Sequence, residues 1–203
     1  KNRLQMTALH KKTPGPALDD IIIVARRQFV RGERIDLPAI ADQLGISRAT
    51  AYRWVGNADE LTGLVISSLM QDTFTRLKGE TKHLRGAKRI LEMLEHGMRE
   101  IAAFKPFKEF LNQNPEKGLR LIASKDGPVQ SFTIKLHQGL LEEEMRRGAL
   151  QLPVDAHTMA YAITRLSESF LYADLISGEK PEFDKVITIL RLMLRPDVPR
   201  GVK

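Results

Sequence analysis

Residues Leu37–Trp54, LPAIADQLGISRATAYRW, contain two short helical patterns that meet at Gly45. Each pattern repeats apolar or small residues on one face, so both segments can pack against a common neighbour. These residues are Ile40, Ala41, Leu44, Ile46, Thr50 and Trp54. Gly45 can adopt the positive φ that a tight turn requires, and Ser47 can cap the second segment. The stretch therefore predicts a helix-turn-helix.

In such a unit the second helix enters the major groove of DNA, where its first residues meet base edges and phosphates. We expect Arg34, before the first of the two helices, to add positive charge to this surface. The predicted DNA-binding residues are Arg34, Ser47, Arg48, Ala49, Thr50, Tyr52 and Arg53. An ordinary hairpin of two helices is the alternative interpretation, because glycine turns and serine caps are common there too.

Positive charge is concentrated in the first quarter of the chain. Ten Lys or Arg residues and five acidic residues precede Trp54, so this segment carries +5 of the net charge of +7. Such an excess suits a polyanion such as nucleic acid, which binds through phosphate contacts and counterion release. A solvated basic face without a partner explains the same charges.

Composition limits the class of protein. The 203 residues include 42% hydrophobic residues and no cysteine, which favours a globular fold and excludes disulfides, thiolate metal sites and cysteine nucleophiles. We find no signal peptide and no apolar run of the ~20 residues that a membrane span needs. We therefore expect a soluble, cytoplasmic protein without membrane contact.

The segments around the helix-turn-helix complete a small domain. Residues 1–17 read as a flexible basic arm, and a helix is predicted from Leu18 to about Arg31. Asp36 can cap the helix that follows. Asn57 and Glu60 form a capping box ahead of a long helix that runs to about Lys78.

The run from Ala25 to Leu61 resembles the DNA-binding domain of the TetR family of transcriptional repressors. The residues that carry the resemblance are Ala25–Phe29, Ile40–Ala41, Leu44–Ser47, Thr50, Tyr52–Trp54 and Asn57–Leu61. Four positions depart from the family pattern: Asp36, Ala49, Val55 and Ala58. Because Ala58 stands where a phosphate-binding lysine is common, we expect Arg34, Arg48, Arg53 and the basic arm to supply that charge.

The rest of the chain also reads as helical, so the predicted fold class is all-α. Helices are expected at about 87–104, 107–113, 116–124, 128–147, 155–177 and 182–194. The predicted organisation is an N-terminal three-helix helix-turn-helix domain, residues 18–56, followed by a larger helical domain, residues 57–203. The resemblance implies that this larger domain binds an effector and forms the homodimer.

The last two long helices are expected to form the dimer. They repeat apolar residues on faces suited to lengthwise packing, and the resemblance implies a four-helix interface between two copies. The predicted interface residues are Met159, Ile163, Leu166, Phe170, Val186, Leu190 and Met193. Packing in the core of a single chain is the alternative. A dimer can read a palindromic operator when its recognition helices lie ~34–36 Å apart, and a ligand that alters this spacing would release the DNA.

Large apolar side chains in the middle helices are consistent with an effector cavity. The predicted ligand-binding residues are Met93, Phe104, Phe107, Phe110, Phe132, Tyr161, Arg165, Glu168 and Tyr172. The last four share a helix face and fit a pocket, the dimer interface or a solvated Arg–Glu pair. A lactone, acyl chain or aromatic compound would suit these residues. The C-terminal part weakly resembles TetR-type regulators of lactone-degrading genes.

Enzyme chemistry is not expected. The segment Gly45–Ala49 has the look of a hydrolase nucleophile elbow, but the preceding residues read as helix where an elbow needs a strand. The five histidines lack paired metal-ligand spacing, and we find no phosphate-binding loop, so no metal or cofactor is predicted. A ligand-insensitive or architectural DNA-binding protein is the main alternative to a regulator.

Overall fold

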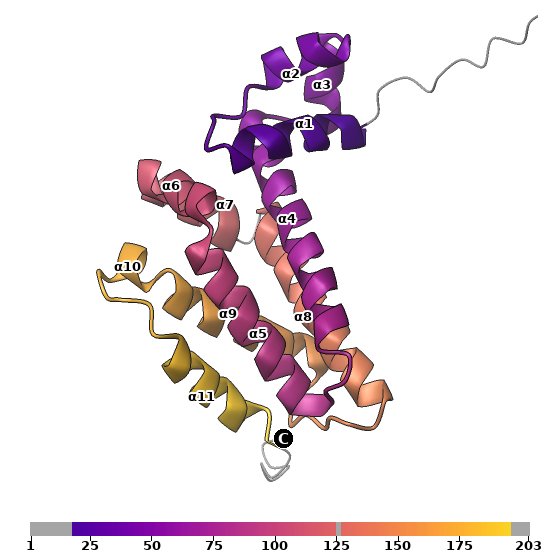
Figure 1. Ribbon diagram of the computed structural model, residues 1–203, viewed down its shortest axis with the longest axis vertical. Coiled ribbons are helices and arrows are strands. Elements are labelled where there is room, and N and C mark those ends of the chain that lie inside the picture. The colour runs from indigo at the N-terminus through magenta and orange to yellow at the C-terminus, as the bar shows by residue number, and fades with distance from the viewer. Residues whose placement is uncertain (1–17, 125–126, 196–203) are drawn as a thin grey trace, which may run out of the picture.

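The computed structural model describes residues 18–124 and 127–195, and these residues form eleven α-helices and no strands (Figure 1). The helices are α1 Leu18–Val30, α2 Leu37–Leu44, α3 Arg48–Val55, α4 Ala58–Glu80, α5 Gly86–Ala103, α6 Lys105–Gln113, α7 Pro115–Ala123, α8 Pro128–Arg146, α9 Ala156–Leu171, α10 Ala173–Ile176 and α11 Phe183–Met193. The all-α prediction is confirmed. The predicted basic arm lies outside the described residues.

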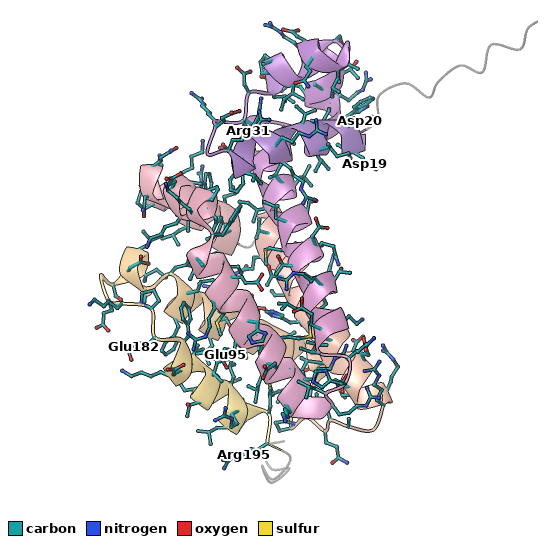
Figure 2. The ribbon with its side chains drawn as sticks, in the orientation of Figure 1. Asp19, Asp20, Arg31, Glu95, Glu182 and Arg195 are labelled. Carbon is teal, nitrogen blue, oxygen red and sulfur yellow. The ribbon has the colours of Figure 1, made fainter. Side chains whose placement is uncertain are left out.

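Helices α1, α2 and α3 stack at one end of the molecule, on the first half of α4 (Figure 1). Figure 2 shows Asp19 and Asp20 at one end of α1 and Arg31 at the other, the arrangement that the helix dipole favours. The predicted caps are confirmed. Ser47 Oγ accepts a hydrogen bond from the Thr50 amide at 3.1 Å, and Asp36 and Asn57 cap α2 and α4 in the same way.

The turn between α2 and α3 depends on Gly45, which has a φ of +66° and an empty space where a Cβ would lie. We expect Gly45→Ala to destabilise the protein by about 1–2 kcal/mol. This is the strain of an alanine in left-handed backbone, because no neighbouring atom would clash with the added methyl group. Gly139 in α8 has equally open surroundings but helical backbone, so Gly139→Ala should stabilise by about 0.5–1 kcal/mol. Urea unfolding of both variants checks the pair, and a loss of equal size in both would contradict it.

A continuous apolar core joins the helix-turn-helix to the rest of the chain. This upper core combines Ile21 and Phe29 of α1 with Leu61 and Val65 of α4, and it continues through α6 and α7 to Tyr172. It therefore crosses the boundary that we predicted after residue 56. Helices α4 and α6 therefore share one core with the helix-turn-helix.

A second, lower core fills the space between α4, α5, α8, α9 and α11. The helix predicted over residues 155–177 is interrupted: α9 ends at Leu171, and the short α10 follows Tyr172. The Tyr172 ring is buried, 6.3 Å from the ring of Phe107, so this residue ties the end of α9 to α6. No described helix combines the length and the apolar character needed to cross a bilayer.

The predicted dimer residues require a correction. Met159, Ile163, Val186 and Leu190 are at most 3% exposed and belong to the lower core of one protomer. Leu166, Phe170 and Met193 are half-buried against the same core. The repeat thus marks the side of each helix that faces its own chain, because periodicity reports burial and not the identity of the neighbour.

A buried cluster of charges closes the lower end of the molecule. The Arg89 guanidinium, 2% exposed, lies 2.6 Å from Glu144 and 2.8 Å from Glu143, and the Gly86 amide donates to Glu144 at 2.7 Å. Lys78 also pairs with Glu143. Burial alone would raise the pKa of Glu143, but hydrogen bonds and charge from Lys78 and Arg89 outweigh it and lower the pKa to about 2. The cluster joins the ends of α4, α5 and α8.

Candidate functional site

Helix α3 presents the predicted DNA-contacting residues on an open surface. Arg48, Ala49, Tyr52 and Arg53 are exposed, whereas Ala51 faces the core. Ser47 and Thr50 form the capped start of the same helix, and Arg34 is exposed in the loop between α1 and α2. The structure therefore gathers six of the seven predicted residues in one short segment.

Arg48 makes only a loose contact in this surface. Its guanidinium lies 3.4 Å from Asp42, and both side chains are about two thirds exposed. Exposed ion pairs of this kind contribute little to stability, so Arg48 can turn toward a phosphate or a base at small cost.

Arg26 fixes the helix-turn-helix to the larger part of the chain. Its guanidinium donates to Ser68 Oγ at 2.8 Å and to Asp72 at 2.6 Å, both on α4. The charge of Arg26 is thereby directed to α4 rather than to α3. The sequence analysis did not identify this contact, because its partners lie more than forty residues away.

A cavity of about 450 Å³ lies between the two cores, a volume within the range of small-molecule sites. Its wall combines residues of α1, α4, α5, α6, α7, α8 and α9 with two residues that follow α5 and α9. The lining residues are Phe29, Ile66, Leu69, Met70, Thr73, Phe74, Leu77, Met93, Leu94, Gly97, Met98, Glu100, Ile101, Ala103, Phe104, Phe107, Ile122, Val129, Thr133, Leu136, His137, Leu140, Thr164, Ser167, Glu168, Leu171 and Tyr172. The wall is mostly apolar.

Five of the nine predicted ligand-binding residues line this cavity: Met93, Phe104, Phe107, Glu168 and Tyr172. The other four lie outside its wall. Phe110 packs beside it, with ring centroids 5.8 Å from Phe29 and 6.4 Å from Phe107, and Phe132 lies half-buried on α8.

Tyr161 and Arg165 turn away from the cavity. Tyr161 is 50% exposed on the outer face of α9. The Arg165 guanidinium donates to the Ala123 carbonyl oxygen at 3.2 Å and to Glu168 at 2.8 Å. Arg165 and Glu168 form an ion pair, but the Glu168 side chain is 15% exposed and lines the cavity, so the pair is not on a solvated stripe.

Phe29 connects the cavity to the DNA-binding end. This residue of α1 lines the cavity, and its ring centroid lies 6.4 Å from that of Phe104. Phe29 also contacts Phe110, with ring centroids 5.8 Å apart, so α1 meets the cavity side of the chain through two aromatic contacts. Neither the cavity position of Phe29 nor these contacts were predicted.

Polar groups are grouped on the α8–α9 side of the cavity. His137 Nδ1 and Thr164 Oγ1 lie 2.8 Å apart, and burial lowers the pKa of His137 to about 4. Burial raises the pKa of Glu168, although the charge of Arg165 opposes the shift. Burial, followed by the charge of Glu168, also raises the pKa of Tyr172. At neutral pH the histidine is uncharged.

The described residues contain no group of three or more His, Cys, Asp or Glu arranged to hold a metal ion. The histidine that lines the cavity was set aside in the sequence analysis because it had no partner at metal-ligand spacing. A better signal was available: His137 follows Leu136 and precedes Leu140 on an apolar helix, where a polar side chain must find a buried partner.

A family profile described as "Tetracyclin repressor-like, C-terminal domain" matches residues 85–195, more than half of the chain. The chain belongs to the TetR family. The resemblance drawn from the sequence is thereby confirmed: the chain is a TetR-family transcriptional regulator with a helix-turn-helix near its N-terminus.

Two solved TetR-fold structures show how widely the architecture is shared. The R. erythropolis transcriptional repressor QsdR is 25% identical, with a TM-score of 0.80, over 87% of this chain and 93% of its own. The Bacillus subtilis regulator FadR, solved with stearoyl-CoA, is 12% identical with a TM-score of 0.54, over 90% of this chain and all of its own. The second similarity shows the fold alone. No curated protein sequence matches the chain significantly.

Proposed function

We propose that this TetR-family chain is a ligand-responsive transcriptional repressor. It binds a palindromic operator as a homodimer through α3, and a small apolar effector in the 450 Å³ cavity releases it. The observation that supports this proposal best is that Phe29, one of the residues that line the cavity, also belongs to the core that holds the helix-turn-helix.

The effector acts by shifting a population of conformations. A molecule that fills the cavity contacts Phe104 and Phe107, at the start of α6, and α6 itself contacts α1. Movement of α6 therefore passes to α1, which carries α3 with it. An effector that binds more tightly to the conformation with displaced α3 helices than to the DNA-binding conformation weakens operator binding. The weakening is limited by the ratio of its two affinities.

We place the dimer interface on the outer faces of α9 and α11. Ile189 and Leu192 are 38% and 51% exposed on α11, and Tyr161 is exposed on α9. The neighbouring Ala162 and Ser169 are small, so a second helix can approach closely. Outward apolar residues on two long helices supply the surface that a four-helix interface buries.

Replacing Leu192 by Glu should weaken dimerisation at least 100-fold, because the twofold axis brings like charges to one apolar contact. Analytical ultracentrifugation over a concentration series measures this. Ile23→Glu on α1, a residue of similar exposure, is the matched control and should leave the dimer intact. Equal dimer dissociation constants for the two variants would show that the interface lies elsewhere.

The repressor proposal is tested by fluorescence anisotropy with DNA fragments that flank the gene for this chain. We expect one fragment to bind ~1,000-fold or more tightly than bulk DNA. Equal binding to all fragments would instead support an architectural DNA-binding protein. Specific binding without release by any lactone, acyl compound or aromatic compound would remove the effector from the proposal.

A further inference from the structure

The cavity holds no positive charge on its wall. Among the lining residues that the structure describes, Glu100 and Glu168 are the acidic ones, and none is Lys or Arg. Both carboxylates are paired with arginines that lie outside the wall, Arg76 and Arg165. An anion that entered would lose its hydration without gaining a cationic partner, which is a costly transfer.

His137 offers the cavity a hydrogen-bond acceptor. The Thr164 hydroxyl donates its one hydrogen to the Ala160 carbonyl oxygen at 2.8 Å. It must therefore accept from His137, so the proton of the imidazole lies on Nδ1. The other nitrogen, Nε2, is then an acceptor, and no described residue donates to it.

Ser167 of α9, three residues after Thr164, adds an unsatisfied polar group beside this acceptor. Its hydroxyl is buried and has no hydrogen-bond partner among the described residues. Thr164 and Ser169 on the same helix both donate to the carbonyl oxygen four residues earlier, and Ser167 does not. A buried polar group without a partner is uncommon and costly, so Ser167 favours a ligand that supplies the missing bond, and His137 Nε2 offers the same ligand an acceptor.

We propose that the effector is an uncharged, largely apolar molecule with one hydrogen-bond donor, a hydroxyl or an amide N–H, which His137 Nε2 accepts at the α8–α9 wall. Ser167 then donates to the oxygen of the hydroxyl, or to the carbonyl oxygen of the amide. The inference rests on the proposed function in one respect, that this cavity is the effector site. It excludes free carboxylates and phosphates from the preferred ligands.

Three eight-carbon probes test the class of ligand at pH 7.5. 1-Octanol donates and accepts, its isomer 1-methoxyheptane only accepts, and octanoate is an anion. Isothermal titration with the full-length dimer should rank them in this order, with the alcohol at least 10-fold tighter than the ether. Octanoate binding as tightly as 1-octanol, or no binding by any probe, would overturn the inference.

Variants locate the acceptor. His137→Leu should reduce the preference for alcohol over ether to within about 2-fold and leave ether binding unchanged. Thr164→Val removes the group that holds the proton on Nδ1, so it should reduce the preference as well and serves if the first variant does not fold. Thr73→Val alters a cavity hydroxyl on α4 and should keep the full preference. Loss of preference in Thr73→Val alone would overturn the assignment to His137.

A separate operator-release assay distinguishes the two proposals. Probes that bind in the expected order without releasing the operator would contradict the repressor mechanism and leave the chemistry of the cavity as proposed. A carboxylate that releases the operator through this cavity would support the repressor mechanism and contradict the proposed chemistry of the cavity.

Discussion

Replacing Arg89 by Met should destabilise the fold by about 3–5 kcal/mol, the usual cost of leaving buried charges without their partner. Glu144 is fully buried, the Glu143 side chain is 16% exposed, and Arg89 is bonded to both. Methionine fills similar space but provides neither charge nor donors. Urea unfolding at pH 7 measures the loss.

Two further variants identify the cause. Arg99→Met breaks ion pairs with Glu95 and Asp184 that lie at the surface, and its effect should be much smaller. The double variant Arg89→Met, Glu144→Leu should be more stable than Arg89→Met alone, because in the single variant the fully buried Glu144 carboxylate keeps only the partly exposed Arg147 and the Gly86 amide as partners. A double variant that is less stable than the single one would show that packing, not charge, determines the loss.

The same cluster predicts how stability depends on pH. The pKa of Glu143 is about 2 in the folded chain, below its ordinary value of 4.5. A lowered folded pKa means that its stabilising contribution is complete above about pH 4.5 and disappears as the pH falls toward 2. In Arg89→Met this part of the acid dependence should become weaker, because a main cause of the lowered pKa is gone.

Replacing Arg48 by Ala should weaken operator binding at least ~30-fold. A lost base or phosphate contact costs at least about 1 kcal/mol, and a homodimer loses it in both half-sites. Anisotropy with the operator at fixed salt gives the ratio. Arg120→Ala removes the same charge from an exposed position on α7 and should change binding far less. Unchanged affinity in Arg48→Ala would remove this residue from the DNA surface.

The helix-turn-helix was predictable because its signals are local. Asp36, Ser47 and Asn57 each cap a helix by bonding amides two or three residues away, and Gly45 adopts its turn without help from other segments. Such contacts depend on the order of neighbouring residues, which the sequence displays directly.

The cavity was predictable only in part, because its polar wall forms across helices. His137 and Thr164 lie twenty-seven residues apart and become partners only when α8 packs on α9. Phe132 was placed in the cavity because aromatic character suggests a pocket, but its position on α8 turns it aside. Four of the predicted dimer residues lie in the protomer core for a related reason: residues such as Ile163 and Leu190 repeat at helical spacing, and that spacing does not distinguish the core from a partner.

Helix α4 runs from the helix-turn-helix down along the larger part of the molecule (Figure 1). Its first turns belong to the core beneath α1, Met70 and Thr73 line the cavity, and Lys78 near its last turn is tied to Glu143. With 23 residues at about 1.5 Å each, the helix is a rod of about 35 Å. Because its lower end is anchored by ion pairs, a tilt of about 5° at that anchor displaces the upper end by about 3 Å. A rotation about this anchor that shifts the middle of α4 would shift the end beneath α1 about twice as far, which a short helix would not do.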